Sequence, residues 1–261
     1  MNRNIPLTPA EIHLWLAFYD EITDRRLHSA YRELLNPAEK EQESRFYFAR
    51  DRRRYLITRA LARTVLSRYA PVRPEEWVFS ANAYGRPEIV NAQARDAGLS
   101  FNISHTHSLI VLGVTDSRAI GVDVENFRAR EVSIDIADRF FAPQEVAALT
   151  ATPPRRQQYR FFEYWTFKES YIKARGMGLS LPLDKFSFHY PNDRAVKIAI
   201  DPELADEPNR WQFWQFRPRP EYLVAICAER IGARSPSLIV RQAVPMLGEK
   251  TFDPEFLRVS E

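Results

Sequence analysis

The short segment at residues 120–125 alternates apolar positions with small or acidic ones, as a strand with two different faces does. In an extended strand, residues i and i+2 point to the same side. The apolar residues at 120, 122 and 124 would therefore share one face, and Asp123 and Glu125 would share the other. Like charges this close repel each other, so such a pair is tolerated where it is exposed, shares a proton or shares a cation. An ordinary solvated strand face is the alternative at this point.

Two segments far apart in the chain predict the same helical arrangement. Residues 36–63 and 142–175 each open with the pattern x-P-x-E, which is typical of a helix that starts with proline and has an acid in its first turn. Each continues into a long aromatic-rich helix that begins Arg-Phe-aromatic, and setting Arg45 against Arg160 also aligns Ile57 with Ile172. Chance similarity between the two segments is the alternative.

Strand-like segments follow each of these helices. In the first half they are residues 76–81 and 99–115, and in the second half 184–190, 210–216 and 222–229. We therefore expect an α+β protein whose two similar α+β subdomains form an intramolecular pseudodimer. The expected N-terminal subdomain is 1–118, and the C-terminal subdomain, which carries the metal site, is 119–232. Residues 233–261, which contain Pro236, Pro245 and Pro254, are expected to form an irregular tail.

The composition is that of a globular protein, and its charge does not select a partner. Of the 261 residues, 45% are hydrophobic and 13% aromatic, which excludes disorder as the main state. The apolar run at 109–114 is too short to span a bilayer, and the N-terminus is unlike a secretory signal. We expect a cytoplasmic protein, with Cys227 as a small core residue. A net charge of +3 suits a polyanionic small molecule, an acidic protein or nucleic acid.

The segment WTFKESYIK, residues 165–173, places a carboxylate and an ammonium on one helical stripe. Trp165, Glu169 and Lys173 are spaced i, i+4, i+8 and so lie along one side of a helix. An exposed ion pair is the simple alternative, but aromatic residues nearly surround this helix, and buried charges need partners. A cleft shared with Asp123 and Glu125 would supply them, because three oxygen ligands completed by waters and phosphates make a reasonable Mg²⁺ site.

Three other segments offer polar or basic side chains. His105 and His107 could bind zinc, but no third soft ligand lies near them in the sequence, so Ser104 and His105 are expected to donate hydrogen bonds to an anion or a base edge. Residues 83–89 predict a turn followed by a strand, with Arg86 at the surface. The four arginines at 50–54 cannot all share one helical face, so one or two of them would face the cleft and bind phosphate.

Taken together, these segments resemble a known family. FNISHT, IGVDVE with RFFAPQEV after it, and WTFKESYIKARGMGLSLPL are similar to the three motif blocks of the Sfp-type 4′-phosphopantetheinyl transferases, in the same order and with similar gaps. The resemblance covers residues 35–230. It implies a two-subdomain pseudodimer that transfers the 4′-phosphopantetheine arm of coenzyme A to a serine of an apo acyl carrier or peptidyl carrier protein, releasing adenosine 3′,5′-bisphosphate. We expect a monomer, since the internal pseudodimer already forms the cleft.

The resemblance also implies which residues hold the metal and take part in the chemistry. Asp123, Glu125 and Glu169 would hold Mg²⁺ against the coenzyme A pyrophosphate. Lys173 would contact the pyrophosphate, and Lys168 would assist it. We expect Glu169, or a metal-bound water polarised by it, to accept the serine proton. Glu145, which matches an acid of the family with a base-like role, is the reserve.

The residues expected to bind the nucleotide end of coenzyme A depart in part from the family pattern. Ser104 and His105 would face the 3′-phosphate and adenosine, and Arg86 stands where the family commonly has a lysine beside the adenine. The family often has lysines before the RFY block, whereas this chain has AEKEQES there. Lys40, Arg45 or an arginine at 50–54, for which we take Arg53, would substitute for them.

Two other functions stay open. A metal-dependent nuclease also uses Asp, Glu and Lys, but common ones place Glu-x-Lys on a strand, whereas Glu169 and Lys173 are four positions apart on a helix. A non-catalytic carrier-binding protein would bind coenzyme A without turnover, and the intact set of acids and lysine argues against it. Because an acidic carrier explains the mildly basic chain better than nucleic acid does, we expect neither nucleic acid nor a membrane as a partner.

Overall fold

The chain folds into helices and strands of the α+β class. The computed structural model describes residues 5–129, 131–232 and 235–260. The helices are α1 (Arg25–Glu33), α2 (Pro37–Arg45), α3 (Ala49–Leu66), α4 (Ala92–Asp96), α5 (Pro143–Thr150) and α6 (Pro154–Arg175). The strands are β1 (Glu11–Phe18), β2 (Phe79–Ala81), β3 (Pro87–Ile89), β4 (Leu99–His105), β5 (Leu109–Asp116), β6 (Ile120–Asn126), β7 (Phe186–His189), β8 (Lys197–Ile200), β9 (Trp211–Phe216), β10 (Tyr222–Glu229), β11 (Ser237–Val244), β12 (Gly248–Phe252) and β13 (Phe256–Val259). No described helix has the length and apolar character needed to cross a bilayer.

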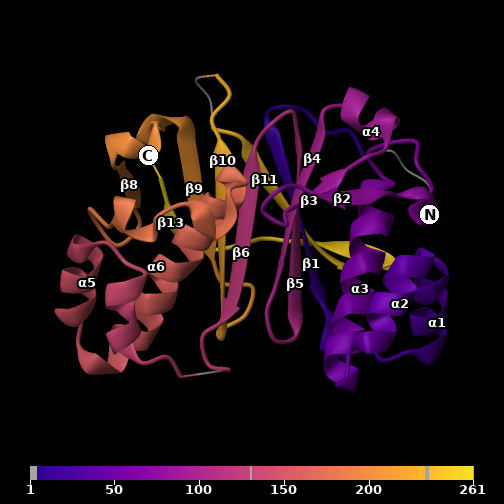
Figure 1. Ribbon diagram of the computed structural model, residues 1–261, viewed down its shortest axis with the longest axis horizontal. Helices are drawn as coiled ribbons and strands as arrows, with labels where there is room; N and C mark the ends of the chain where they lie inside the picture. Colours follow the sequence, from indigo (N-terminus) through magenta and orange to yellow (C-terminus); the bar gives the residue numbers. More distant parts are fainter. Residues whose placement is uncertain (1–4, 130, 233–234, 261) are drawn as a thin grey trace.

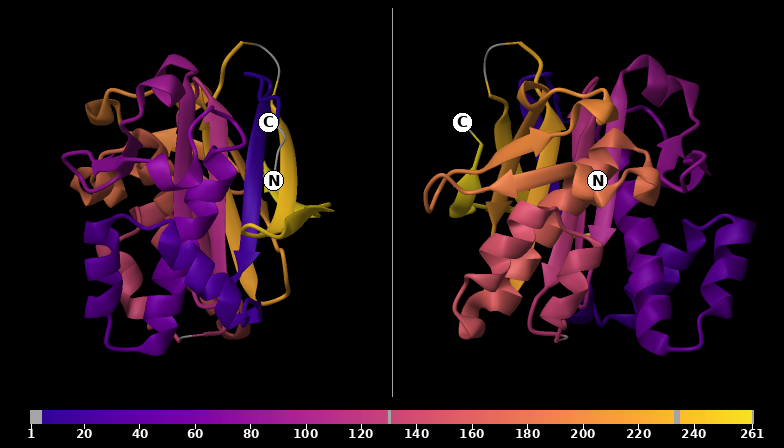
Figure 2. Two further views of the ribbon diagram at one scale, coloured as in Figure 1. Left: turned by 90° about the vertical axis from the view of Figure 1, so that its right-hand side faces the viewer. Right: turned by 60° about the vertical axis from the view of Figure 1, so that its left-hand side comes forward.

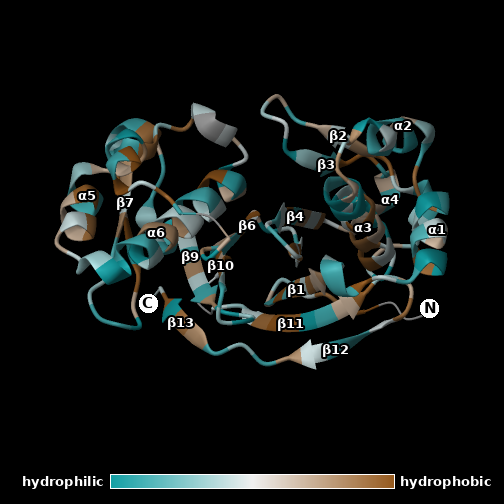
Figure 3. Ribbon diagram, turned by 90° about the horizontal axis from the view of Figure 1, so that it is seen from below, coloured by the Kyte–Doolittle hydropathy of each residue, from teal (hydrophilic) through white to brown (hydrophobic). Residues whose placement is uncertain are grey.

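Two sheets stand next to each other at the centre of the molecule (Figure 1). The first has the strand order β12-β11-β1-β5-β4, and the second has the order β13-β9-β10-β6. Viewed from below, the sheets lie between α6 on one side and α3 on the other (Figure 3). The strands β4 and β6, each at the end of its own sheet, run close together. This junction is where the two halves of the chain meet.

The alternation of side chains along β6 divides it into an apolar face and an acidic face, as the sequence predicts. Ile120, Val122 and Val124 are at most 2% exposed, and they pack in a core formed by both sheets, together with Ile12 and Leu14 of β1. Two further cores lie under α3 and α6. The apolar face of β6 therefore fixes which way its carboxylates point.

Both predicted helix starts are confirmed, but the predicted long helix of the first half is broken. Asn36 caps α2 by accepting a hydrogen bond from the backbone nitrogen of Glu39 (2.9 Å), and Pro143 begins α5. However, α2 ends at Arg45 and α3 begins at Ala49, because Phe46 and Phe48 between them have extended backbone angles. The alignment of Arg45 with Arg160 is therefore wrong, since Arg160 lies inside α6.

The expectation of an irregular tail is also wrong. Strand β11 pairs in parallel with β1, β12 pairs with β11, and β13 pairs with β9, so the C-terminal segment extends both sheets (Figure 2). Pro236 directly precedes β11, Pro245 directly follows it, and Pro254 lies between β12 and β13. Proline cannot donate to a strand ladder and so gathers at strand ends. The prolines mark the boundaries of these strands.

Gly121 lets the backbone of α6 lie directly against β6. A Cβ atom at this position would stand 1.9 Å from the carbonyl oxygen of Ser170 and 2.4 Å from the backbone nitrogen of Ala174. Both atoms belong to the helix backbone, so a rotamer change cannot relieve either clash. The glycine in IGVDVE thus sets how closely Glu169 and Lys173 approach the acidic face of β6.

Replacing Gly121 with alanine is expected to lower the free energy of unfolding by about 2–3 kcal/mol, because the helix must move away from the strand. Urea unfolding followed by circular dichroism measures this loss. Gly248→Ala is the matched control, since a Cβ at Gly248 meets nothing within 4 Å, and its effect should stay within about 0.5 kcal/mol. Equal stability of the two variants would contradict the close helix–strand contact.

Candidate active site

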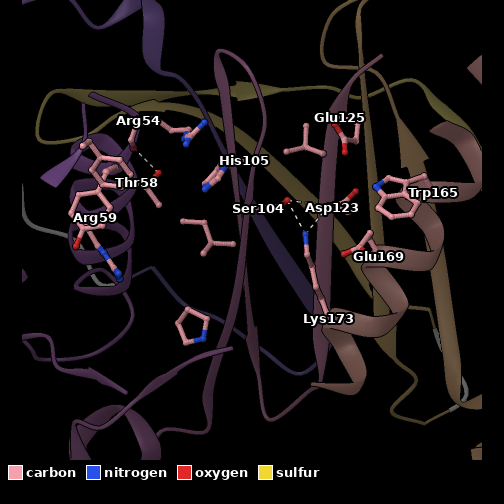
Figure 4. Close-up of a pocket in the computed structure, with 15 residues that line it drawn as sticks. Arg54, Thr58, Arg59, Ser104, His105, Asp123, Glu125, Trp165, Glu169 and Lys173 are labelled. Carbon is pink, nitrogen blue, oxygen red and sulfur yellow. Dashed lines mark hydrogen bonds and ion pairs between the residues drawn. The ribbon is translucent and has the colours of Figure 1, made fainter. Parts of the chain in front are cut away.

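A cavity of about 520 Å³ opens at the junction of β4 and β6, between α3 and α6. Figure 4 shows its two sides, with Asp123, Glu125, Glu169 and Lys173 on one and Arg54 and Arg59 on the other. The residues that line it are Phe46, Arg54, Tyr55, Thr58, Arg59, Pro87, Ile103, Ser104, His105, Asp123, Val124, Glu125, Trp165, Glu169 and Lys173. The predicted helical stripe of Trp165, Glu169 and Lys173 and the predicted acidic face of β6 therefore reach the same cavity.

Asp123 is the most enclosed polar group on the acidic side. Its side chain is 7% exposed, and its Oδ1 accepts hydrogen bonds from Lys173 Nζ (2.6 Å) and from Ser104 Oγ (3.1 Å). Lys173 Nζ also donates to Ser104 Oγ (2.9 Å). Among the described residues, no group hydrogen-bonds to the buried Oδ2 of Asp123. A buried carboxylate oxygen without a donor is costly, so this atom is suited to receive a cation.

Glu169 stands one helical turn before Lys173 and lines the cavity beside Asp123. Burial, reinforced by the negative charge of Asp123 and opposed by Lys173, raises the pKa of Glu169 to about 7 from the ordinary 4.5. The ionised form of Glu169 is therefore destabilised in the folded protein. A cation placed between these carboxylates would remove this destabilisation.

In metal-free buffer, Glu169→Gln is expected to stabilise the protein at pH 8. A carboxyl group whose pKa is higher in the folded than in the unfolded state contributes its full stabilisation at pH values below the unfolded pKa. This contribution is lost as the pH rises through the pKa of the folded state. The variant should therefore gain about 1–3 kcal/mol of unfolding free energy at pH 8 and nothing at pH 4. Thermal unfolding at both pH values with chelator present measures this. An equal difference at the two pH values would contradict the raised pKa of Glu169.

Side chains in β4 and directly after it connect the two sheets, which no backbone ladder joins among the described strands. Asn102 Oδ1 accepts a hydrogen bond from the backbone nitrogen of Val122 (2.8 Å), and Thr106 Oγ1 accepts one from the backbone nitrogen of Asn126 (3.2 Å). Between them, Ser104 donates to Asp123. Asn102 and Ser104 share one face of β4, and Thr106, directly after the strand, continues the same spacing. The segment FNISHT therefore orients the carboxylates of β6, a role that the sequence analysis did not predict.

The opposite side of the cavity is basic and comes mainly from α3. Arg54, Thr58 and Arg59 line it, and they lie across the cavity from the carboxylates (Figure 4). Arg54 forms an ion pair with Asp51 (Nη2 to Oδ1, 3.2 Å), and Arg59 forms one with Glu39 (Nε to Oε1, 3.6 Å). These partners hold the guanidinium groups in place. This side is suited to bind phosphate, which arginine recognises with a planar pair of donors.

His105 joins this basic side from the end of β4. Partial enclosure by the cavity walls, and next the charge of Arg54, lower the pKa of His105. The imidazole is therefore neutral at pH 7 and can donate a hydrogen bond from one nitrogen while accepting one at the other. An anion that approached both His105 and Arg54 would oppose the lowering of this pKa.

Arg45 and Arg53, the arginines expected from the sequence to bind the nucleotide, do not line this cavity. Arg45 forms a surface ion pair with Glu41 (2.5 Å), both side chains being 65% exposed, and Arg53 is not among the residues that line the cavity. Of the arginines that the structure describes, Arg54 and Arg59 are the two that line it. The helical period contained a signal for this choice, because positions 54, 55, 58 and 59 share the side of α3 opposite the buried positions 56, 57, 60 and 61.

Three other predicted residues contact backbone or each other. Lys168 and Glu145 form a fully buried ion pair (2.8 Å, both side chains 0% exposed), away from the cavity. The Arg86 guanidinium donates hydrogen bonds to backbone carbonyl oxygens, among them that of Lys173 (2.9 Å). The structure thus brings together Ser104, His105, Asp123, Glu125, Glu169 and Lys173, and it leaves the side chains of Lys168 and Glu145 out.

The acidic side fits a hard divalent cation in the nature of its donors. Carboxylate and hydroxyl oxygens are the ligands that Mg²⁺ prefers, usually with water and substrate phosphate completing the shell. Within the described ranges of the chain, no three acidic, histidine or cysteine side chains stand close enough to hold a metal by themselves. Asp123 and Glu169, with Glu125 beside them, therefore offer an incomplete set of ligands that a phosphate-bearing substrate would have to complete.

Comparisons with known proteins identify the family. The model of the 4′-phosphopantetheinyl transferase superfamily matches residues 119–227, and that of the 4′-phosphopantetheinyl transferase N-terminal region matches residues 23–117. HetI, a 4′-phosphopantetheinyl transferase of Nostoc sp., is 35% identical over 229 residues, which are 88% of this chain and 92% of the relative. Sfp, a 4′-phosphopantetheinyl transferase of Bacillus subtilis, is 34% identical over 211 residues, or 81% and 89% of the two chains. On these similarities, this chain belongs to the 4′-phosphopantetheinyl transferases of the Sfp type.

Proposed function

We propose that this chain transfers the 4′-phosphopantetheine part of coenzyme A to a serine hydroxyl of an apo acyl carrier or peptidyl carrier protein, in a Mg²⁺-dependent reaction that releases adenosine 3′,5′-bisphosphate. The observation that carries the proposal is the two-sided cavity, with carboxylates and Lys173 on one side and Arg54, Arg59 and His105 on the other. A pyrophosphate bridged to a second phosphate through a ribose needs both kinds of contact. The family membership supports a transferase over a nuclease.

Asp123, Glu125 and Glu169 are proposed to hold the metal. When bound, Mg²⁺ supplies positive charge that neutralises the pyrophosphate. Two observations support this assignment: Asp123 Oδ2 is buried and has no donor within the described chain, and burial beside Asp123 raises the pKa of Glu169 to about 7. Mg²⁺ should therefore stabilise the wild-type protein against thermal unfolding at pH 8, and it should stabilise Asp123→Asn less.

The chain's own side chains are proposed to bind and orient the reactants. Lys173 Nζ, now shared between Asp123 and Ser104, donates to the pyrophosphate. The serine oxygen of the carrier attacks the phosphorus that bears the pantetheine, the bond from this phosphorus to the bridging oxygen breaks, and the Glu169 carboxylate accepts the serine proton. Since charge builds on phosphate oxygens during this step, fixed donors and close positioning provide most of the catalysis.

We also propose that the two halves of the chain are structural repeats. Three neighbouring strands of the first sheet, β1-β5-β4, correspond to three of the second, β6-β10-β9. In this correspondence β1 matches β6, β5 matches β10 and β4 matches β9. Along the chain, a helix pair follows the first strand of each repeat: α2 and α3 follow β1, and α5 and α6 follow β6. The first helix of each pair begins with a proline, which comes after asparagine in α2 and after alanine in α5. The repeat supports an intramolecular pseudodimer, and we propose a monomer because one chain supplies both sides of the cavity.

Release of adenosine 3′,5′-bisphosphate tests the proposed reaction. The protein is incubated with coenzyme A, Mg²⁺ and an apo carrier protein, and the product is quantified by liquid chromatography. The expected result is release in proportion to the carrier, none with chelator and none with a carrier whose serine is replaced by alanine. Release that is independent of the carrier serine would show hydrolysis of coenzyme A instead and would overturn the proposed acceptor.

A further inference from the structure

The hairpin of β2 and β3 is attached to the far end of α6 by two side chains from the turn between its strands. Asn82 Nδ2 donates to the carbonyl oxygen of Gly176 (3.0 Å), and Arg86 Nη1 donates to the carbonyl oxygens of Lys173 (2.9 Å) and Ala174 (3.4 Å). The last carbonyl groups of a helix lack partners within the helix. A cation there also interacts favourably with the negative end of the helix dipole. The hairpin thus adds two side chains to the C-terminal cap of α6, which Gly176 forms with its own backbone nitrogen.

The second terminal nitrogen of the same guanidinium reaches both central strands. Arg86 Nη2 donates to the carbonyl oxygens of Phe101 in β4 and Ile120 in β6, each at 3.3 Å. Nη1 therefore donates hydrogen bonds to the helix, and Nη2 donates hydrogen bonds to the two strands at the junction between the sheets. Burial lowers the pKa of this guanidinium, and its four acceptors are all backbone oxygens. Both terminal nitrogens of the guanidinium are thus used to join three elements.

The three elements that Arg86 joins are those that carry the acidic side of the cavity. Lys173, whose carbonyl oxygen receives the 2.9 Å hydrogen bond, uses its own ammonium to contact Asp123 at 2.6 Å. Ile120 lies three residues before Asp123 on β6, and Glu169 lies one turn before Lys173 on α6. A shift of the last turn of α6 would move Lys173 and Glu169 relative to Asp123. Misplacement by about 1 Å can reduce a rate about 10²-fold.

We propose that Arg86 is a positioning residue, which fixes the last turn of α6 against the junction of β4 and β6 and does not bind coenzyme A through its guanidinium. The inference rests on the proposed transfer reaction. It replaces the contact with adenine that the sequence resemblance implied for this position. A lysine could not replace these contacts, because its single nitrogen can donate hydrogen bonds either to the helix or to the two strands. The two terminal nitrogens of the guanidinium donate to both.

The test compares Arg86→Met and Arg86→Lys with Arg95→Met, an exposed arginine of α4 that lines the same neighbouring cavity as Arg86. Each variant is assayed with coenzyme A and with an analogue in which hydrogen replaces the adenine base. For a positioning residue, kcat should fall at least about 10-fold in both Arg86 variants, with KM for coenzyme A changed less than about 2-fold. The loss should be equal with both substrates, and Arg95→Met should match the wild type.

Hydrogen exchange gives a readout that does not depend on activity. The amides at the end of α6, including that of Gly176, which donates to the carbonyl oxygen of Ile172 (3.0 Å), should exchange faster in the Arg86 variants while the rest of α6 stays protected. A raised KM with unchanged kcat, or a loss that vanishes with the analogue, would show direct binding of adenine and overturn the inference. Unchanged kinetics and exchange would overturn it as well. Failure of the wild type to transfer would refute the proposed function instead, and the exchange measurement would still test the cap.

Discussion

Glu169→Gln is expected to lower kcat for phosphopantetheine transfer by about 10²–10⁴-fold, the usual contribution of a positioned general base. The amide keeps the size and the position of the side chain but cannot accept the serine proton, and it is a weaker metal ligand. The variant should nevertheless fold and, in metal-free buffer at pH 8, be more stable than the wild type, because burial raises the pKa of Glu169 to about 7. Lost turnover together with gained stability is the signature of a group held ionised for function.

Steady-state kinetics at saturating Mg²⁺ and coenzyme A, with the modified carrier quantified by mass spectrometry, give this kcat. Glu41→Gln is the control, since Glu41 lies on the surface in an ion pair with Arg45 and its loss should leave kcat unchanged. Near-normal turnover of Glu169→Gln at saturating Mg²⁺ would remove Glu169 as the base. The proton acceptor would then have to be sought among the other groups at the cavity.

Breaking the ion pair between Glu145 and Lys168 is expected to produce the largest loss of stability. Both side chains are fully buried. Lys168 Nζ also donates to the carbonyl oxygens of Leu183 (2.7 Å) and Phe186 (2.6 Å). Glu145 accepts hydrogen bonds from two backbone nitrogens, one of them that of Phe188 (2.7 Å). Lys168→Met leaves the carboxylate buried without its cation, which should cost about 3–5 kcal/mol of unfolding free energy.

A double-mutant cycle in urea separates this structural role from the reserve base role that the sequence suggested for Glu145. Glu145→Gln combined with Lys168→Met should be more stable than Lys168→Met alone, with a coupling energy of about 1–3 kcal/mol. The exposed pair of Glu41 and Arg45 is the matched control, for which coupling should not exceed about 0.5 kcal/mol. If Glu145→Gln abolished turnover and left stability unchanged, Glu145 would be a base, and this structural assignment would be wrong.

The parts of the fold that depend on local patterns could be predicted from the sequence. The alternation at 120–125 placed Asp123 and Glu125 on one face of a strand, and helical spacing placed Glu169 and Lys173 on one stripe, because both patterns follow directly from backbone geometry. The starts of α2 and α5 followed from their proline and acid for the same reason. What these patterns could not give is the pairing of β11 with β1, in which Ser237 lies opposite Glu11, because that contact joins opposite ends of the chain.

Other expected site residues lie outside the cavity, for a different reason. Lys168 is one position before Glu169, yet it points into a buried core, since neighbouring helical residues are about 100° apart around the axis. Arg53 and Arg54 are separated by the same angle, and Arg54 lines the cavity whereas Arg53 does not. A motif aligns residue types but does not give the direction of each side chain. Arg86 shows a further limit, because its four acceptors are backbone oxygens, and a sequence cannot reveal where they lie.

The intact mass of an apo carrier protein tests the central claim most directly. An apo acyl carrier and an apo peptidyl carrier protein are each incubated with this protein, coenzyme A and Mg²⁺, with and without chelator, and beside the Glu169→Gln variant. At least one carrier should gain the mass of one phosphopantetheine, chelator should prevent the gain, and the variant should slow it by about 10²–10⁴-fold. No gain on either carrier by a folded protein that binds coenzyme A, or a gain that persists with chelator, would contradict the central claim.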